Sequence, residues 1–322
     1  MNLFRRILTA LLPALALSAG GCFTGVESTP RISNADVNRI QAAQLTPEQQ
    51  FLTGIAPLPP SQWRPGRTWR VANDRISLIF TSASDPADAL AGHTISYEGE
   101  NRALGLRGED GVELIFRSDD GRRLFYRVPG MTRERFDTIP ALDVPFTVDL
   151  DIVARLDSAM RGRTYFVRTP AWYTTGTRQA VGGLRHIPVH IDSVGPGDEN
   201  FPAAVYFTVT DPQYASILPA GATSYMVYMS LGDSKAATRN FDTIFAFDNP
   251  RRRYPEIKDD VWELIIRSRL RDGMTRDECR LALGAPPQVT RVPTYGGMVE
   301  QWTYTDGVYL YFEDGFLTRF RQ

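Results

Sequence analysis

The C-terminal stretch 259–287 reads DDVWELIIRSRLRDGMTRDECRLALGAPP and predicts two helices in succession. In the first, Asp260 is a good N-cap and Gly273 stands where a left-handed C-cap belongs. Four apolar residues recur between them at about helical spacing: Val261, Leu264, Ile265 and Leu270.

The second helix is predicted to begin at a capping box. The hydroxyl of Thr275 can accept a hydrogen bond from the amide of Glu278 while the Glu278 carboxylate reaches back, and Met274 and Cys279 are placed as a hydrophobic staple. The helix should stop at Gly284, because the two prolines that follow cannot continue it.

Beyond a loop at Gly296-Gly297 the apolar pattern changes from helical spacing to simple alternation, which predicts strands. Three alternating segments follow: Trp302 and Tyr304; Val308, Leu310 and Phe312; Phe316, Thr318 and Phe320. The pairs Asp306-Gly307 and Asp314-Gly315 are typical hairpin turns. The stretch therefore predicts two helices followed by a three-stranded antiparallel meander.

The order and spacing of these residues are similar to those of a known family. The relevant motifs are Gly273-Met274-Thr275-x-x-Glu278-x-Arg280-x-x-Leu283-Gly284-x-Pro286, Glu300-x-Trp302-x-Tyr304 and Tyr311-Phe312-x-Asp314-Gly315. They resemble the SmpA/OmlA domain of the outer-membrane lipoprotein BamE. The resemblance implies an ααβββ fold at residues 256–322, a role in outer-membrane assembly through protein contacts, and no catalytic residues. Similar folds also occur in secreted inhibitor proteins, and this chain departs from the family in having more than two hundred residues before the domain and Cys279 in the second helix.

Residues 1–21 have the features of a secretory signal peptide. Arg5 and Arg6 precede an apolar run from Ile7 to Ala19, and there is no acidic residue. The segment ends Leu17-Ser18-Ala19-Gly20-Gly21-Cys22, which resembles a bacterial lipobox with Ala19 in place of the usual leucine. That resemblance implies a diacylated Cys22 and a membrane anchor. Because residue 23 is Phe and not the Asp that retains lipoproteins at the inner membrane, an outer-membrane location is expected.

The charge and the cysteine content bear on nucleic-acid binding and on disulfide formation. Loss of Arg5 and Arg6 with the signal leaves 34 basic and 37 acidic residues, a formal charge of −3, which argues against binding to nucleic acid. With Cys22 lipidated, Cys279 is left alone and cannot form an internal disulfide. No cofactor is expected.

Residues 22–62 are interpreted as a lipidated tether with short helices. An amphipathic segment at 35–44 precedes Thr46-Pro47, a good N-cap followed by proline at the first helical position, and three prolines up to Pro60 suggest a stiff linker.

Two small β domains, barrels or sandwiches, are predicted at residues 63–137 and 138–250. Gly66-Arg67-Thr68-Trp69-Arg70-Val71 recurs as Gly162-Arg163-Thr164-Tyr165-Phe166-Val167, which suggests an internal repeat. Its Gly-x-x-aromatic-x-Val pattern is loosely similar to the first strand of Src-homology-type barrels. Alternating segments follow each copy: Ile76, Leu78 and Phe80; Val112, Leu114 and Phe116; Leu124, Tyr126 and Val128; Ile187, Val189 and Ile191; Val205, Phe207 and Val209; Tyr225, Val227 and Met229.

The sequence offers little support for a catalytic or metal site. His186 and His190 would lie too far apart along one strand to share a metal, and Asp192, Asp198 and Glu199 flank a Gly-Pro-Gly turn in a spacing that matches no calcium loop known to us. No nucleophile elbow, phosphate-binding loop or His-Glu-x-x-His motif occurs. Arg251-Arg252-Arg253 is interpreted as a solvated linker before the C-terminal module.

One stretch is a candidate binding loop. Trp172 and Tyr173 lie in the segment 169–183, beside Thr174-Thr175-Gly176 and without strand patterning, whereas most other aromatic residues fall in apolar alternation typical of a core. The leading hypothesis is a non-catalytic, lipid-anchored envelope protein that binds other envelope proteins. The alternatives are a surface lipoprotein that binds glycan or peptide, and a periplasmic hydrolase.

Overall fold

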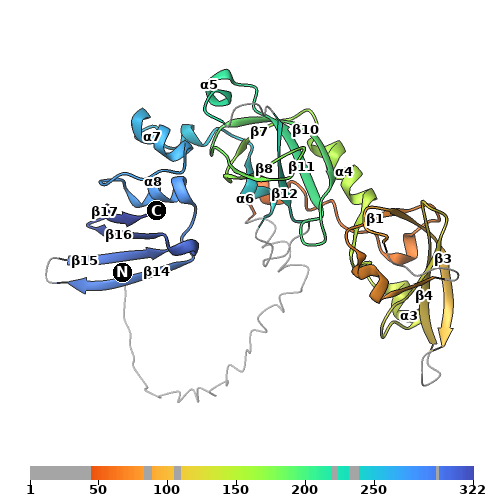
Figure 1. Cartoon of the computed structure of the whole chain (residues 1–322). Helices are drawn as coiled ribbons and strands as arrows, with labels where there is room; N and C mark the ends of the chain where they lie inside the picture. The colour runs from red at the N-terminus through yellow and green to blue at the C-terminus, as the bar shows by residue number, and fades with distance from the viewer. Residues whose placement is uncertain (1–44, 83–88, 105–109, 219–223, 232–238, 295–296) are drawn as a thin grey trace, which may run out of the picture. The chain divides into compact units, whose positions relative to one another are not determined.

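The computed structural model describes residues 45–82, 89–104, 110–218, 224–231, 239–294 and 297–322 (Figure 1). The predicted signal peptide, the predicted lipidation site Cys22 and the segment 35–44 lie outside these ranges. The described chain forms three antiparallel sheets of six, seven and four strands, one of them curled into a half-barrel, which confirms a mainly β fold. Within the same ranges, no helix is both long and apolar enough to cross a bilayer.

The first sheet has the strand order β2-β5-β4-β3-β1-β6. Its strands are β1 (Thr68–Val71), β2 (Phe80–Ser82), β3 (Thr94–Leu104), β4 (Asp110–Ser118), β5 (Arg123–Arg127) and β6 (Thr147–Asp149). The 3-10 helices η1 (Pro60–Gln62) and η2 (Asp74–Leu78) and helix α3 (Arg133–Thr138) complete the unit. The predicted strand from Ile76 is wrong before Phe80, because the Asn73 side chain accepts a hydrogen bond from the amide of Arg75 and starts η2 instead.

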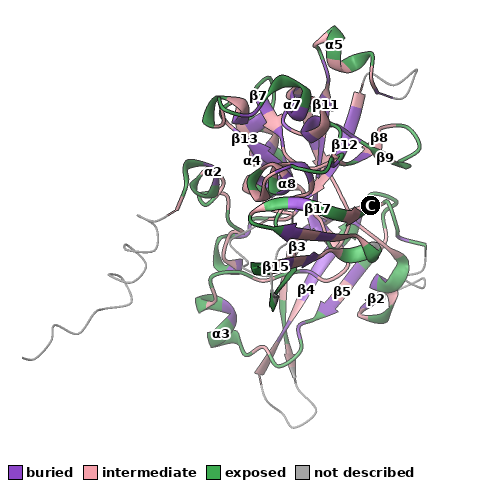
Figure 2. Ribbon diagram, turned by 90° about the vertical axis from the view of Figure 1, so that its left-hand side faces the viewer, coloured by how far each residue is buried: buried purple, intermediate pink, exposed green. Residues whose placement is uncertain are grey.

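The second sheet has the order β13-β7-β10-β11-β12-β8-β9. Its strands are β7 (Thr164–Val167), β8 (Ala171–Thr174), β9 (Ala180–Gly182), β10 (Pro188–Pro196), β11 (Ala203–Thr208), β12 (Ser224–Met229) and β13 (Phe245–Ala246). Helices α5 (Pro212–Ala215) and α6 (Phe241–Ile244) lie in its connections. Figure 2 shows the exposed α5, which has no buried residue, at the end of this unit.

The two sheets repeat one strand order. In each, an opening strand (β1 or β7) lies between a three-stranded meander and a strand that returns after it (β6 or β13). A short strand from the first connection (β2 or β8) pairs with the last strand of the meander. Both opening strands follow a glycine with positive φ, 94° at Gly66 and 75° at Gly162. The shared order supports the duplication that the six-residue repeat suggests.

Helix α4 (Leu150–Met160), which was not predicted, lies between the two sheets. Asp149 caps it by accepting hydrogen bonds from the amides of Asp151 (3.0 Å) and Ile152 (3.4 Å). Its apolar face is buried and packs against β10 and β1. Because β6 belongs to the first sheet, the predicted domain boundary at residue 138 falls too early.

The predicted tether is wrong after residue 44, because the chain there is already part of the folded body. Helix α2 (Pro47–Gln50) begins at the predicted cap, Thr46. Phe51 then packs against Phe241, Phe247 and Tyr165, with ring centroids 4.8, 5.2 and 6.1 Å away. This aromatic contact fixes the segment to the second sheet.

The C-terminal module contains two helices and a four-stranded sheet. Its elements are α7 (Asp259–Ile266), α8 (Arg276–Leu283), β14 (Gln288–Thr294), β15 (Gly297–Thr303), η4 (Thr305–Gly307), β16 (Tyr309–Glu313) and β17 (Phe316–Arg321), preceded by η3 (Pro250–Arg253). The capping box of Thr275 and Glu278 is present as predicted. The first helix ends four residues before Leu270, since Ser268 takes a positive φ of 56°. The sheet has one strand more than expected, β14. This strand was not predicted because all of 287–293 is exposed, so no buried face produces an alternating apolar pattern in the sequence.

Glu300 is the polar centre of this module. Its side chain is 3% exposed, accepts hydrogen bonds from Arg291 Nε (2.8 Å) and Trp302 Nε1 (2.5 Å), and lies 3.3 Å from Arg276 Nε. Burial alone raises the pKa of this carboxyl, but the hydrogen bonds from Arg291 and Trp302 and the nearby Arg276 outweigh burial and lower the pKa below the ordinary value. One carboxylate thus joins β14, β15 and the start of α8.

We expect Glu300→Ala to lower the free energy of unfolding by about 2–3 kcal/mol, because it leaves two arginines without a counter-ion; the loss stays below that of a fully buried pair since Arg291 is largely exposed. Urea unfolding at pH 7 measures it. The stabilisation is present above the ordinary pKa of 4.5 and disappears as the pH falls through the lowered folded-state pKa.

Glu313→Gln, on the exposed side of β16, is the control and should change stability by less than about 0.5 kcal/mol. Equal effects of the two variants would contradict the role of Glu300.

Candidate functional site

Trp172, half of the predicted binding loop, is a core residue. It lies on β8 with 0% exposure, and its ring packs against Phe207 and Tyr225 at centroid distances of 5.0 and 5.2 Å. A Cβ at Gly183 would lie 2.1 Å from this ring, so only glycine fits there. The segment 169–183 forms the β8–β9 hairpin, and the prediction that it lacks strands is wrong. The two strands are three and four residues long, too short to show alternation in sequence.

Tyr173 lies on the same strand but is only half-buried. Its ring meets the edge of Tyr228 at 5.1 Å. A binding role at this hairpin stays a prediction for Tyr173 alone.

The acidic residues singled out in the sequence have separate partners, and so does the third histidine, His93. His93 Nδ1 lies 2.6 Å from Asp119, while Asp192 accepts a hydrogen bond from the Thr208 hydroxyl at 2.7 Å. Asp198 accepts hydrogen bonds from the amides of the turn at 200–201, and Glu199 binds the side chains of Asn73 and Arg75. Across the described ranges, no group of three His, Cys, Asp or Glu side chains is placed to hold a metal.

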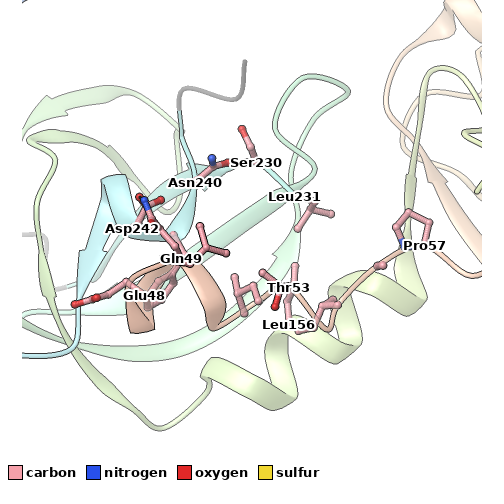
Figure 3. Close-up of a pocket in the computed structure, with 14 residues that line it drawn as sticks. Glu48, Gln49, Thr53, Pro57, Leu156, Ser230, Leu231, Asn240 and Asp242 are labelled. Atoms are coloured by element: carbon pink, nitrogen blue, oxygen red, sulfur yellow. The ribbon is translucent and has the colours of Figure 1, made fainter. Parts of the chain in front are cut away.

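The structure has an apolar groove of about 580 Å³ beside α2 (Figure 3). Leu156 of α4, Leu231 and Thr53 form its walls, and Gln49 and Asp242 lie together at the other end. The Gln49 side chain donates a hydrogen bond to Asp242 at 3.2 Å, so the two polar side chains at this end of the groove are bonded to each other.

A second cavity, of about 560 Å³, lies between the second sheet and the C-terminal helices and is lined by arginine. We call it the arginine cleft. Its charged lining residues are Arg168, Arg185, Arg253, Arg280, Asp242 and Asp248, and His186 is also part of the wall. The cations come from positions up to 112 residues apart, 168 to 280, so spacing along the chain gives no sign of the cluster.

Arg185 and His186 create this cleft by joining the sheet to the helices. The Arg185 guanidinium donates hydrogen bonds to Ser268 Oγ (3.0 Å) and to the carbonyls of Arg168 (2.6 Å) and Leu283 (3.2 Å). Its backbone amide donates to the carbonyl of Ile266 (2.8 Å), at the end of α7. Helix ends leave carbonyls without intrahelical partners, so one arginine satisfies acceptors at the ends of both α7 and α8.

His186 completes the join in an uncommon backbone conformation, with φ of 58°. Its Nε2 lies 2.9 Å from the Leu281 carbonyl and therefore donates to it, and its ring is 5.7 Å from that of Trp262. Nδ1 is buried with no hydrogen-bond partner among the described atoms. Burial lowers the pKa of His186 to about 4, outweighing the bond to Leu281, and the neighbouring Arg185 and Arg168 lower it further. Burial likewise lowers the pKa of Arg185 to about 10.

The first strand of the C-terminal sheet, β14, is a free edge. It pairs only with β15 among the strands that the structure describes. Three apolar side chains on this hairpin are exposed: Val289 at 43%, Val292 at 50% and Met298 at 50%. Proteins usually shorten, cover or charge such edges or place proline in them, and β14 carries one charge, that of Arg291, and one proline near its end, Pro293.

Comparison of this chain with protein-family models, curated protein sequences and solved structures gives no match.

We predict that His186 makes stability depend on pH. The unfolded chain takes up this proton near the ordinary value of 6.5 and the folded chain only near 4, so the stability that the neutral ring contributes is full above 6.5 and falls below it. The loss by pH 4 should be about 3 kcal/mol, at about 1.4 kcal/mol per pH unit. The measurement is the difference in urea unfolding between the wild type and His186→Asn, followed from pH 7.5 to 4; Asn tolerates the positive φ.

His190→Asn is the matched control. His190 lies on β10, half-buried, and its replacement should leave the pH dependence of the wild type in place. If the two variants titrate alike, His186 is not the group responsible.

Proposed function

We propose that the chain is a lipid-anchored protein of the bacterial outer membrane that acts through contacts with other envelope proteins and catalyses no reaction. A diacyl group on Cys22 holds the N-terminus in the bilayer, and the folded body from residue 45 onward presents the binding surfaces. The near-neutral charge agrees with a protein partner and not with nucleic acid.

The free edge of β14 is the observation that carries the proposal. A strand with one unpaired side offers a row of backbone donors and acceptors, and an extended segment of a partner can satisfy them by strand addition. The exposed Val289, Val292 and Met298 would add apolar contacts on both faces of such a segment. We therefore propose an extended strand of an envelope protein as the occupant.

The BamE-like assignment of residues 256–322 rests on the agreement between motif and core. The capping box starts α8, Glu300 and Trp302 are buried beneath it, and the strands follow in antiparallel order. The additional strand β14 is the departure from the expected three-stranded meander, and it is also the strand with the free edge.

We expect Cys22→Ser to move the protein from the membrane fraction to the soluble fraction, because it removes the acyl chains. Fractionation and the mass of the N-terminal peptide measure this. Cys279→Ala is the control: Cys279 is 0% exposed, and burial raises its pKa to about 12, so it carries no reactive thiolate and its loss should leave the protein in the membrane. An unmodified Cys22 in the exported wild type would refute the anchor.

We expect a photo-crosslinking amino acid at Val292 to capture an envelope protein in intact cells, and Val292→Lys to reduce co-purification of that protein about tenfold, a loss of about 1.4 kcal/mol. The same changes at Phe316, an apolar residue 53% exposed on the opposite edge strand β17, are the matched control and should have no effect. Crosslinks at both edges or at neither would contradict the proposal. A crosslink between two copies of this chain would make a second copy the occupant in place of the envelope protein.

A further inference from the structure

We infer that the arginine cleft binds a ligand that carries a phosphate group. The inference is independent of the contact proposed at β14, because no residue of β14 or β15 lines the cleft. Four guanidinium groups and two carboxylates line the cleft, a formal charge of +2. A guanidinium presents several donors in a planar fork that matches the oxygens of phosphate.

Two of the arginines have donors left to offer. Arg185 is held by three neutral oxygens, those of Ser268, Arg168 and Leu283, and by no carboxylate of the described chain. A guanidinium has five N–H groups. Arg253 is exposed, and its guanidinium makes no hydrogen bond or ion pair with any residue that the structure describes. Cations left in this way at a cavity attract an anion.

The other two arginines are held in place by contacts that include one ion pair each, which offsets part of their charge. Arg168 donates to the carbonyl of Asp242 at 2.6 Å and lies 3.9 Å from Glu48. Arg280 pairs with Asp277 at 2.8 Å and lies over the Trp302 ring, 4.8 Å from its centroid. These contacts fix the side chains before a ligand arrives, which lowers the entropic cost of binding.

The carboxylates compete only in part with a ligand. Asp242 already accepts a hydrogen bond from Gln49 in the neighbouring groove. Asp248 also lines the cleft, and two carboxylates outside its lining, Glu48 and Asp277, pair with Arg168 and Arg280. The cavity of about 560 Å³ exceeds a single phosphate group and falls in the range of small-molecule sites, so we expect the phosphate to be part of a larger molecule.

The three arginines of the run Arg251-Arg252-Arg253 differ in their surroundings. Arg251 is used structurally: it donates to the carbonyl of Tyr254, pairs with Asp259 at 3.0 Å and lies over the Trp262 ring. Arg253 lines the cleft, and Arg252 does not. The two exposed neighbours are therefore a matched pair for a test.

Isothermal titration of the full lipidated chain in detergent tests the inference, with inorganic pyrophosphate and short-chain phosphatidylglycerol as phosphate probes and citrate as a carboxylate probe. We expect saturable binding of at least one phosphate probe, weakened about tenfold by Arg253→Gln or Arg280→Gln, unchanged by Arg252→Gln, and weakened further by salt. Tighter binding of phosphatidylglycerol identifies a lipid headgroup as the source, and tighter binding of pyrophosphate identifies a soluble phosphate compound.

Three results would overturn the inference. They are no saturable binding of either phosphate probe, equal effects of Arg252→Gln and Arg253→Gln, and citrate binding as tightly as the phosphate probes. Both positions are exposed, so these variants keep the fold and the comparison remains readable.

Discussion

The hydrogen bonds of Arg185 and His186 to the ends of α7 and α8 are the constraint on which the C-terminal half depends. Helix C-termini carry carbonyls that must find donors when they are buried, and here the donors come from the connection between β9 and β10. The buried residues of the second sheet and of the C-terminal module form one continuous core around this join. The arginine cleft is its by-product, since the same two residues form part of the cleft's wall.

Local signals in the sequence were sufficient where the chain decides its own structure. The capping box at Thr275 and the stops at Gly284 and Pro286 depend on neighbours in sequence, and they hold. The edge strand β14 was missed because an exposed strand has no buried face to produce alternation. Helix α4 was missed although its local signals are present, since Asp149 is an N-cap and the buried residues recur at helical spacing.

The candidate sites also differ in how far the local sequence could predict them. Trp172 looked like a surface residue because the strands of its hairpin are short, yet its ring fills the core over Gly183. The cleft could not be predicted, because Arg168, Arg185, Arg253 and Arg280 meet only after two sheets and two helices are in place. Glu300 is intermediate: the motif singled it out, but its partner Arg291 lies on the strand that was not foreseen.

The shared strand order has a consequence for how the chain folds during synthesis. Trp69 pairs with Asp149, and Val167 pairs with Phe245. Each sheet is therefore completed only when a strand about eighty residues after its opening strand has been synthesised. Contacts so distant in sequence form slowly. Until they form, one edge of the opening strand has unpaired backbone N–H and C=O groups, with which a strand of another chain can pair. The protein therefore passes twice through a stage at which it is open to misassembly, and we expect its yield to depend on what protects the nascent chain over those two intervals.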